Sequence, residues 1–143
     1  MAAQARPAGG EQHRRVLVAD NEPDHRWLVR LALEDSVDFD VVGEASDGAQ
    51  AAQQALDMQP DVVLLDVDMP GRDGLASLAA VQAAAPRAKV VLMTAYADEP
   101  GLAARAASKG VPLLDKLDFV VDLTDRLNAA LAPCQQRRPS QGS

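Results

Sequence analysis

The 143-residue chain has little of what several classes of protein require. Cys134 is its only cysteine, so neither an internal disulfide nor a cysteine-rich metal site can form. Its longest apolar runs are far shorter than a membrane-spanning helix needs, and residues 1–10 contain no apolar core of a signal peptide. We therefore expect a cytoplasmic protein that makes no membrane contact.

Positive charge is also scarce in the region expected to fold. Residues 16–133 contain 20 acidic and 9 basic side chains, a net charge of −11, whereas the whole chain has a net charge of −7. A nucleic-acid-binding face needs clustered lysine and arginine, so we expect no nucleic-acid partner. The glycines form neither a G-x-G-x-x-G nor a P-loop pattern, and no phosphate-cradling loop of those kinds is predicted.

The chain length and composition indicate one domain between two loose tails. Residues 1–14 and 133–143 are rich in Gln, Gly, Pro, Ser and Arg and poor in apolar residues, so we expect both to be flexible. Residues 15–132 are predicted to form a single folded domain, and the apolar content of the chain, 48%, is enough for it to bury a core.

Short apolar runs alternate with helical patterns through this domain. Strands are predicted at 16–19, 39–44, 61–65, 90–93 and 111–114. Helices are predicted at 24–35, at 48–58 with Asp47 as its cap, around Leu75–Val81, at about 100–108 and at 118–131. Five strands that are each followed by a helix predict an α/β fold with a doubly wound parallel sheet.

The first helical segment carries the only tryptophan of the chain. Leu28, Leu31 and Ala32 have the spacing of one helix face, and we expect this stripe to be buried. Trp27 lies beside the stripe rather than within it, which makes it either a partly buried packing residue or a partner contact. His25 has no metal-ligand partner at a suitable spacing, so we expect it to be a solvent or packing residue.

The most informative segment runs from Val62 to Gly74. Four apolar residues lead directly into Asp66, and a Met-Pro turn with a glycine follows. The apolar run predicts a strand buried on both faces, which places Asp66 at its carboxyl end, where open α/β sheets bind ligands. A charged carboxylate there is unfavourable unless it has a function. The alternative, that Asp66 caps a helix, is weaker because the Met-Pro turn delays the next helix.

Other polar residues follow the neighbouring strands. Asp20 and Asn21 come after the first strand, Thr94 ends the fourth, and Lys116 lies just beyond the fifth. All carboxyl ends of a parallel sheet meet at one edge, so these groups are expected to lie together. Carboxylates beside a lysine and a hydroxyl suit a hard divalent cation and a phosphoryl group.

At these positions the chain resembles the receiver domain of bacterial two-component response regulators, over about residues 15–132. Residues 15–24 resemble the opening strand and acidic pair of that family, and Asp66-x-x-Met69-Pro70-x-x-x-Gly74 matches its phosphoacceptor motif. Thr94-Ala95 and Lys116 fall where the family has its Thr/Ser-Ala pair and its lysine. The resemblance implies a flavodoxin-like fold with the strand order 2-1-3-4-5.

The resemblance also implies a function and a ligand set. Asp66 would accept a phosphoryl group from the phosphohistidine of a histidine kinase or a phosphotransfer protein, with Thr94 and Lys116 contacting the phosphoryl oxygens. Mg²⁺ would be held by Asp20, Asn21, Asp66 and the backbone carbonyl of Asp68. Such a protein is not an enzyme in its own right, although it catalyses its own phosphorylation and dephosphorylation.

The acidic pair departs from the family pattern. Asn21 replaces a carboxylate, so we expect weaker Mg²⁺ binding. A shifted alignment would make Ala19 and Asp20 the pair, but it would bury Arg15 in the strand. Glu22 offers a replacement charge, although its turn position normally points away from the site.

Two further departures lie near the fifth strand. Leu113 stands where the family has an aromatic residue that responds to phosphorylation, so the coupling to output is expected to differ. Leu117 replaces a common proline, and the loop before Lys116 looks about one residue short. Near the active edge, Asp68 and Tyr96 flank the site and are the positions where we expect control of the phosphoryl lifetime.

Three functions fit this sequence. The leading one is a stand-alone receiver that signals through another protein, with a homodimer through the fourth helix, fifth strand and fifth helix as an option. The second is a degenerate receiver that binds a partner without phosphorylation, as Asn21 and Leu113 suggest. The third is an aspartate-nucleophile phosphatase of the haloacid-dehalogenase type, because Asp66-Val67-Asp68 resembles its D-x-D motif.

Overall fold

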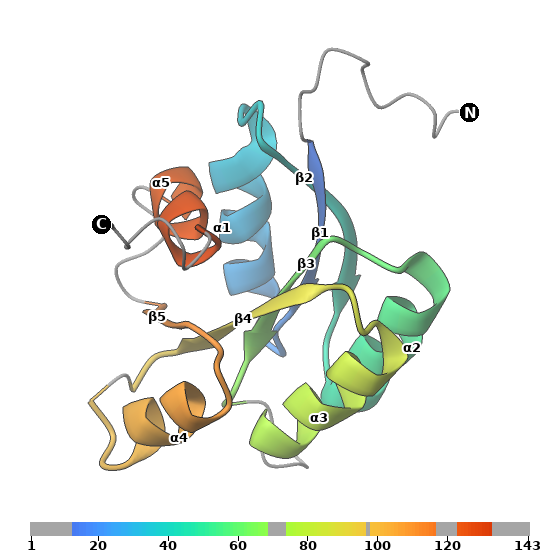
Figure 1. Cartoon of the computed structure of the whole chain (residues 1–143). Helices are drawn as coiled ribbons and strands as arrows, with labels where there is room; N and C mark the ends of the chain where they lie inside the picture. The colour runs from blue at the N-terminus through green and yellow to red at the C-terminus, as the bar shows by residue number, and fades with distance from the viewer. Residues whose placement is uncertain (1–12, 69–73, 97, 117–122, 133–143) are drawn as a thin grey trace, which may run out of the picture.

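The centre of the structure is a five-stranded parallel β-sheet, seen in the computed structural model of Figure 1. The structure describes residues 13–68, 74–96, 98–116 and 123–132. The strands are β1 (Arg14–Ala19), β2 (Phe39–Ala45), β3 (Val62–Asp66), β4 (Lys89–Thr94) and β5 (Leu113–Asp115). The helices are α1 (Pro23–Glu34), α2 (Gly48–Met58), α3 (Gly74–Ala84), α4 (Leu102–Ser108) and α5 (Leu123–Ala130).

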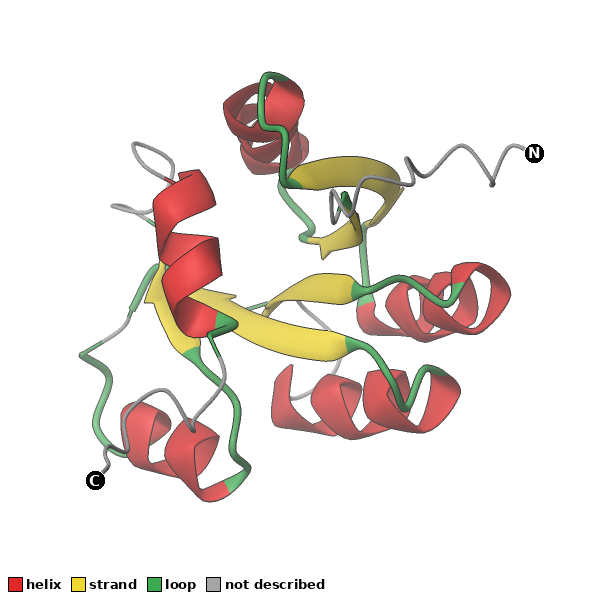
Figure 2. Cartoon of the chain, turned by 45° about the horizontal axis from the view of Figure 1, so that its top comes forward, coloured by secondary structure: helices red, strands yellow, loops and turns green. Residues whose placement is uncertain are grey.

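The strand order in the sheet is β2-β1-β3-β4-β5, and each neighbouring pair is parallel. Parallel neighbours require crossover connections, and each crossover here contains a helix. Helices α1 and α5 pack on one face of the sheet, while α2, α3 and α4 pack on the other (Figure 2). The predicted flavodoxin-like, doubly wound α/β fold is therefore confirmed.

Alternate residues of the central strands point into two separate hydrophobic cores. In β3, Val63 and Leu65 pack with α2, α3 and α4, whereas Val62 and Leu64 pack with α1 and α5. Every residue of β3 is buried. Burial on both faces explains why an unbroken apolar run marks this strand in the sequence.

The buried face of α1 differs from the prediction. Of the predicted stripe, Ala32 packs partly against the core, whereas Leu28 and Leu31 are exposed. The helix buries His25, Val29 and Leu33 instead. Both stripes have helical spacing, but the buried one begins with a polar residue, so a search for apolar residues alone selects the neighbouring stripe. The prediction was wrong because the imidazole of His25 contacts Asp20, which lets a polar side chain occupy a core position.

Most predicted element boundaries agree with the structure to within two residues. Asp47 caps α2 as predicted, accepting a hydrogen bond of 2.8 Å from the backbone of Gln50. β5 begins at Leu113 rather than at residue 111, and β1 begins at Arg14, inside the predicted tail. The Met-Pro turn, residues 117–122 and most of both predicted tails lie outside the described residues.

No helix among the described residues is both long enough and apolar enough to span a bilayer.

Replacing Leu64 with alanine should destabilise the fold by about 2–5 kcal/mol, because a fully buried side chain in the central strand would leave a cavity. Leu56→Ala is the matched control, since Leu56 is 56% exposed and its loss should change stability by less than about 0.5 kcal/mol. Urea denaturation of both variants measures the difference. Equal losses would contradict the assignment of Leu64 to the core.

Candidate functional site

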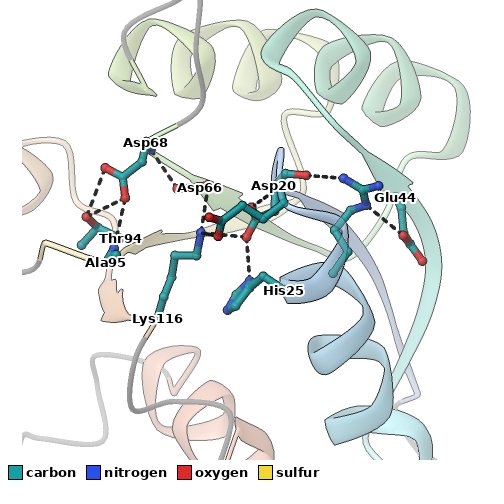
Figure 3. Close-up of polar contacts among 10 residues, drawn as sticks. Asp20, His25, Glu44, Asp66, Asp68, Thr94, Ala95 and Lys116 are labelled. Atoms are coloured by element: carbon teal, nitrogen blue, oxygen red, sulfur yellow. Dashed lines mark hydrogen bonds and ion pairs between the residues drawn. The ribbon is translucent and has the colours of Figure 1, made fainter.

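The carboxyl edge of the sheet brings together residues that are far apart in the sequence. Asp66 is the last residue of β3, and Asp20 directly follows β1, whose final residue Ala19 pairs with Leu65. This register sets the two carboxylates on adjacent strands. Thr94 ends β4 at the same edge, and Lys116 directly follows β5 (Figure 3).

The Asp66 carboxylate is buried and has two partners from the described chain. Its Oδ2 lies 3.1 Å from Nζ of Lys116, and its Oδ1 accepts a hydrogen bond of 2.8 Å from the backbone N–H of Asp68. Asp66 belongs to the β3–β4 ladder, in which it pairs with Met93, and the two described residues that follow it, Val67 and Asp68, form a turn rather than a helix. The alternative interpretation of Asp66 as a helix cap is therefore excluded.

The ammonium group of Lys116 connects three carboxylates. Its Nζ lies 3.0 Å from Asp20 Oδ2, 3.1 Å from Asp66 Oδ2 and 3.2 Å from Glu22 Oε1. The backbone holds the lysine in place, because the N–H of Lys116 donates a hydrogen bond of 2.8 Å to the carbonyl of Thr94. The loop that looked short in the sequence thus allows the lysine to reach the buried carboxylates.

The two buried aspartates have opposite pKa shifts. Burial alone would raise the pKa of Asp20, but hydrogen bonds from His25, from the backbone of Glu22 and from Lys116 outweigh it and lower that pKa to about 2. Burial raises the pKa of Asp66 to about 6, and the nearby charge of Asp20 adds to this effect. Asp66 is thus the carboxylate whose charge the protein accommodates less well.

Lys116 stays charged in this cluster. Burial by itself would lower the pKa of its ammonium group, but the contacts with Asp20 and Asp66 raise that pKa well above its usual value. A buried ammonium between two carboxylates offsets part of their mutual repulsion.

The two residues after Asp20, Asn21 and Glu22, face different surroundings. Asn21 is exposed, whereas Glu22 turns its carboxylate toward Lys116 although most of its side chain remains in solvent. The sequence left open whether Glu22 supplies a replacement charge, and the structure shows its carboxylate facing the site rather than pointing away from it. A buried, charged lysine attracts the nearest carboxylate that can reach it. Because Lys116 is distant in the sequence, this contact cannot be predicted from the residues of the turn alone.

Thr94, Ala95 and Asp68 form a second polar group beside the first. The Thr94 hydroxyl lies 3.1 Å from Asp68 Oδ2, and the backbone N–H of Ala95 donates to the same oxygen at 3.0 Å. Thr94 Oγ1 also accepts a hydrogen bond of 2.9 Å from the N–H of Tyr96, whose ring is largely exposed. The structure thus places the side chain of Asp68, and not only its backbone, at the site.

Sequence reasoning missed two residues that support Asp20. Nδ1 of His25 lies 2.6 Å from Asp20 Oδ2, and Arg26 donates a hydrogen bond of 2.6 Å to the Asp20 carbonyl while pairing with Glu44. His25 is a buried packing residue, one of the two predicted possibilities, but the sequence did not reveal its contact with Asp20. His25 and Arg26 follow Asp20 by five and six residues. This spacing would have indicated a contact with Asp20 only if α1 were already known to begin directly after the turn that follows β1.

Comparison with known proteins identifies relatives along most of the chain. A family model described as the response regulator receiver domain matches residues 16–112. The chemotaxis protein CheY of Listeria monocytogenes is 36% identical over 107 residues, which are 75% of this chain and 84% of that protein. NarL of Mycobacterium tuberculosis is 43% identical over 96 residues, which are 67% of this chain but only 44% of that protein.

Solved structures agree with these sequence matches. The signal receiver domain of NarL from Mycobacterium tuberculosis superimposes with a TM-score of 0.74 at 36% identity, covering 85% of this chain and 99% of that one. The fold and the polar edge together define a receiver-type α/β domain.

The chain belongs to the response regulator receiver family of two-component systems. Receivers are phosphoacceptors, and Mg²⁺ binding at the phosphorylation site is a feature of the family. The family match ends at residue 112, so the position of Lys116 at the site rests on its own contacts in the structure.

Replacing Asp66 with asparagine should stabilise the metal-free protein near neutral pH. A carboxyl whose pKa rises from 3.8 to about 6 on folding destabilises the fold once it is charged in both states. The penalty develops between these two values, so the gain should approach about 3 kcal/mol at neutral pH and largely vanish by about pH 4.

Urea denaturation with a chelator present, at several pH values, measures this gain. Asp57→Asn serves as the control, because Asp57 is an exposed carboxylate and its replacement should give no such pH-dependent gain. A gain for Asp66→Asn that is independent of pH would show that the buried charge is not its cause.

Proposed function

We propose that this protein is a stand-alone receiver that accepts a phosphoryl group on Asp66 from a histidine kinase or a phosphotransfer protein. It acts in the cytoplasm and passes its signal on through protein–protein contacts, without a nucleic-acid or membrane partner. The observation that carries the proposal is the buried Asp66 carboxylate at the carboxyl edge of the sheet, 3.1 Å from Lys116.

The chemistry is an in-line displacement at phosphorus. A carboxylate oxygen of Asp66 forms a bond to phosphorus while the bond between phosphorus and the donor imidazole breaks, and the imidazole leaves with the electron pair of that bond. Asp66 attacks as the anion, which its pKa of about 6 makes available near neutral pH. Lys116 pairs with one phosphoryl oxygen, and the hydroxyl of Thr94 donates to another.

The residues at this edge fit Mg²⁺. The donor set consists of hard oxygens from Asp20, Asn21, Asp66 and the backbone carbonyl of Asp68, which suit this ion. Asp20 and Asp66 are both fully buried, and the charge of Asp20 contributes to the raised pKa of Asp66. When bound, the cation offsets the negative charge of the acceptor carboxylate and of the phosphoryl oxygens.

Two surfaces are candidates for partner contacts. Trp27 is 59% exposed and Leu31 is 49% exposed on α1, the helix that follows the acidic turn of residues 20–22. Exposed aromatic and aliphatic side chains of this kind are frequent at interfaces. The face formed by α4, β5 and α5 is the candidate for the output contact or for a homodimer.

The alternative is a receiver that binds its partner without phosphorylation. Asn21 favours it, because the site has one carboxylate fewer than the acidic pair of the family. The positions of Lys116 and Thr94 favour signalling by phosphorylation. Lys116 contacts Asp66 directly, and Thr94 follows Met93, the residue that pairs with Asp66 in the sheet.

Incubation of the native chain with Mg²⁺ and acetyl phosphate should add one phosphoryl group, observed as a single adduct by intact-mass spectrometry. The Asp66→Asn variant should gain none, and Lys116→Ala should gain much less, because it lacks the ammonium beside the acceptor. If the native chain forms no adduct over a wide range of Mg²⁺ concentrations or with a histidine kinase, the phosphorylation-independent module replaces this proposal.

Restoring the carboxylate at position 21 should strengthen Mg²⁺ binding. Asn21→Asp adds a negative charge at the acidic turn, and we expect its dissociation constant for Mg²⁺ by isothermal titration calorimetry to fall by roughly tenfold. Gln82→Glu, which adds the same charge at an exposed position of α3, should leave Mg²⁺ binding nearly unchanged. Similar effects of both changes would mean that position 21 is not at the metal site.

A further inference from the structure

The side chain of Asp68 points toward Thr94 and Ala95 and accepts hydrogen bonds from both. Its carboxylate accepts from the Thr94 hydroxyl at 3.1 Å and from the Ala95 N–H at 3.0 Å (Figure 3). Thr94 is fully buried, and Asp68 is half-buried. The two donors form a small anion-binding pair that the protein fills with its own carboxylate.

Neither donor can serve a second anion while Asp68 is bound. A threonine hydroxyl has one proton to donate, and the other described contact of Thr94 Oγ1 is a hydrogen bond that it accepts from Tyr96. Ala95 likewise has a single backbone N–H. A new acceptor at this pair therefore has to replace the Asp68 carboxylate.

The donor pair lies beside the acceptor residue. The backbone N–H of Asp68 donates to Asp66 Oδ1 at 2.8 Å, so the segment that carries the competing carboxylate also contacts the carboxylate to be phosphorylated. A phosphoryl group on Asp66 brings anionic oxygens that require donors of this kind. Phosphoryl and carboxylate oxygens have the same hydrogen-bonding chemistry, so they compete for Thr94 and Ala95.

We propose that the Asp68 carboxylate is an internal competitor of the phosphoryl group. It occupies the Thr94–Ala95 donor pair in the unphosphorylated protein and leaves this pair when Asp66 is phosphorylated. This inference rests on the proposed phosphorylation of Asp66. Because the hydrogen bonds to Asp68 are lost when the phosphoryl group binds the donor pair, the phosphorylated state is less stable than it would be if the pair were free. This loss shifts the equilibrium between the two states toward the unphosphorylated one.

Beryllofluoride, a stable mimic of the phosphoryl group, tests the competition at saturating Mg²⁺. Asp68→Ala should tighten its apparent affinity by roughly tenfold, measured by isothermal titration calorimetry, because the donors no longer have to exchange partners. Asp68→Asn should give a smaller gain, because a neutral amide oxygen still accepts hydrogen bonds but holds the donors less strongly. Urea midpoints of both variants verify that they fold.

Removing a negative charge near the site could also favour an anion in a general way, and a double-mutant cycle separates the two causes. Thr94→Val keeps the size of the side chain and removes the hydroxyl. If Asp68 competes for Thr94, the gain in beryllofluoride affinity caused by Asp68→Ala should be much smaller in the Thr94→Val background. An equal gain in both backgrounds would overturn the proposal.

Other outcomes also decide the matter. If Asp68 instead holds Thr94 ready for the phosphoryl group, Asp68→Ala would weaken beryllofluoride binding, and the proposal would be wrong. If the native protein forms the acetyl phosphate adduct but Asp68→Ala does not change the affinity for beryllofluoride, the proposed function stands and the competition is rejected. Adduct formation by neither the native chain nor Asp68→Ala would reject the proposed function itself.

Discussion

The contact between the Lys116 ammonium and two buried carboxylates is the interaction on which the site depends. Asp20 and Asp66 have no exposed surface, and two such charges on adjacent strands are unfavourable without a cation close by. Lys116 reaches both from the end of β5 and thereby connects the ends of β1, β3 and β5. The opposite pKa shifts of the two aspartates follow from unequal support. Hydrogen bonds from His25 and from the Glu22 backbone lower the pKa of Asp20, and neither group is among the described partners of Asp66.

The sheet makes this arrangement possible. Its central strands are buried on both faces, so their apolar side chains provide the stability while the carboxyl ends remain available for polar groups. The parallel register fixes which residues become neighbours, since the pairing of Ala19 with Leu65 places Asp20 beside Asp66. A change of one residue in that register would turn one of the carboxylates toward a hydrophobic core.

The sequence predicted those features that depend on local periodicity. Unbroken apolar runs located β3 and β4, and polar residues directly after strands located Asp20, Asp66 and Thr94. What could not be predicted depends on contacts between distant segments. The burial of His25, the direction of Glu22 and the binding of Asp68 to Thr94 are each decided by a charge or donor that folding brings close, and no local pattern encodes that choice.

The hydrogen-bond donors of the site have partners from the protein itself. Lys116 has carboxylates as partners, and the donors of Thr94 and Ala95 have the carboxylate of Asp68. Under the proposed function, a phosphoryl group and a cation would exchange with these partners rather than fill empty positions. Only the difference between the old and new interactions is available to change the conformation.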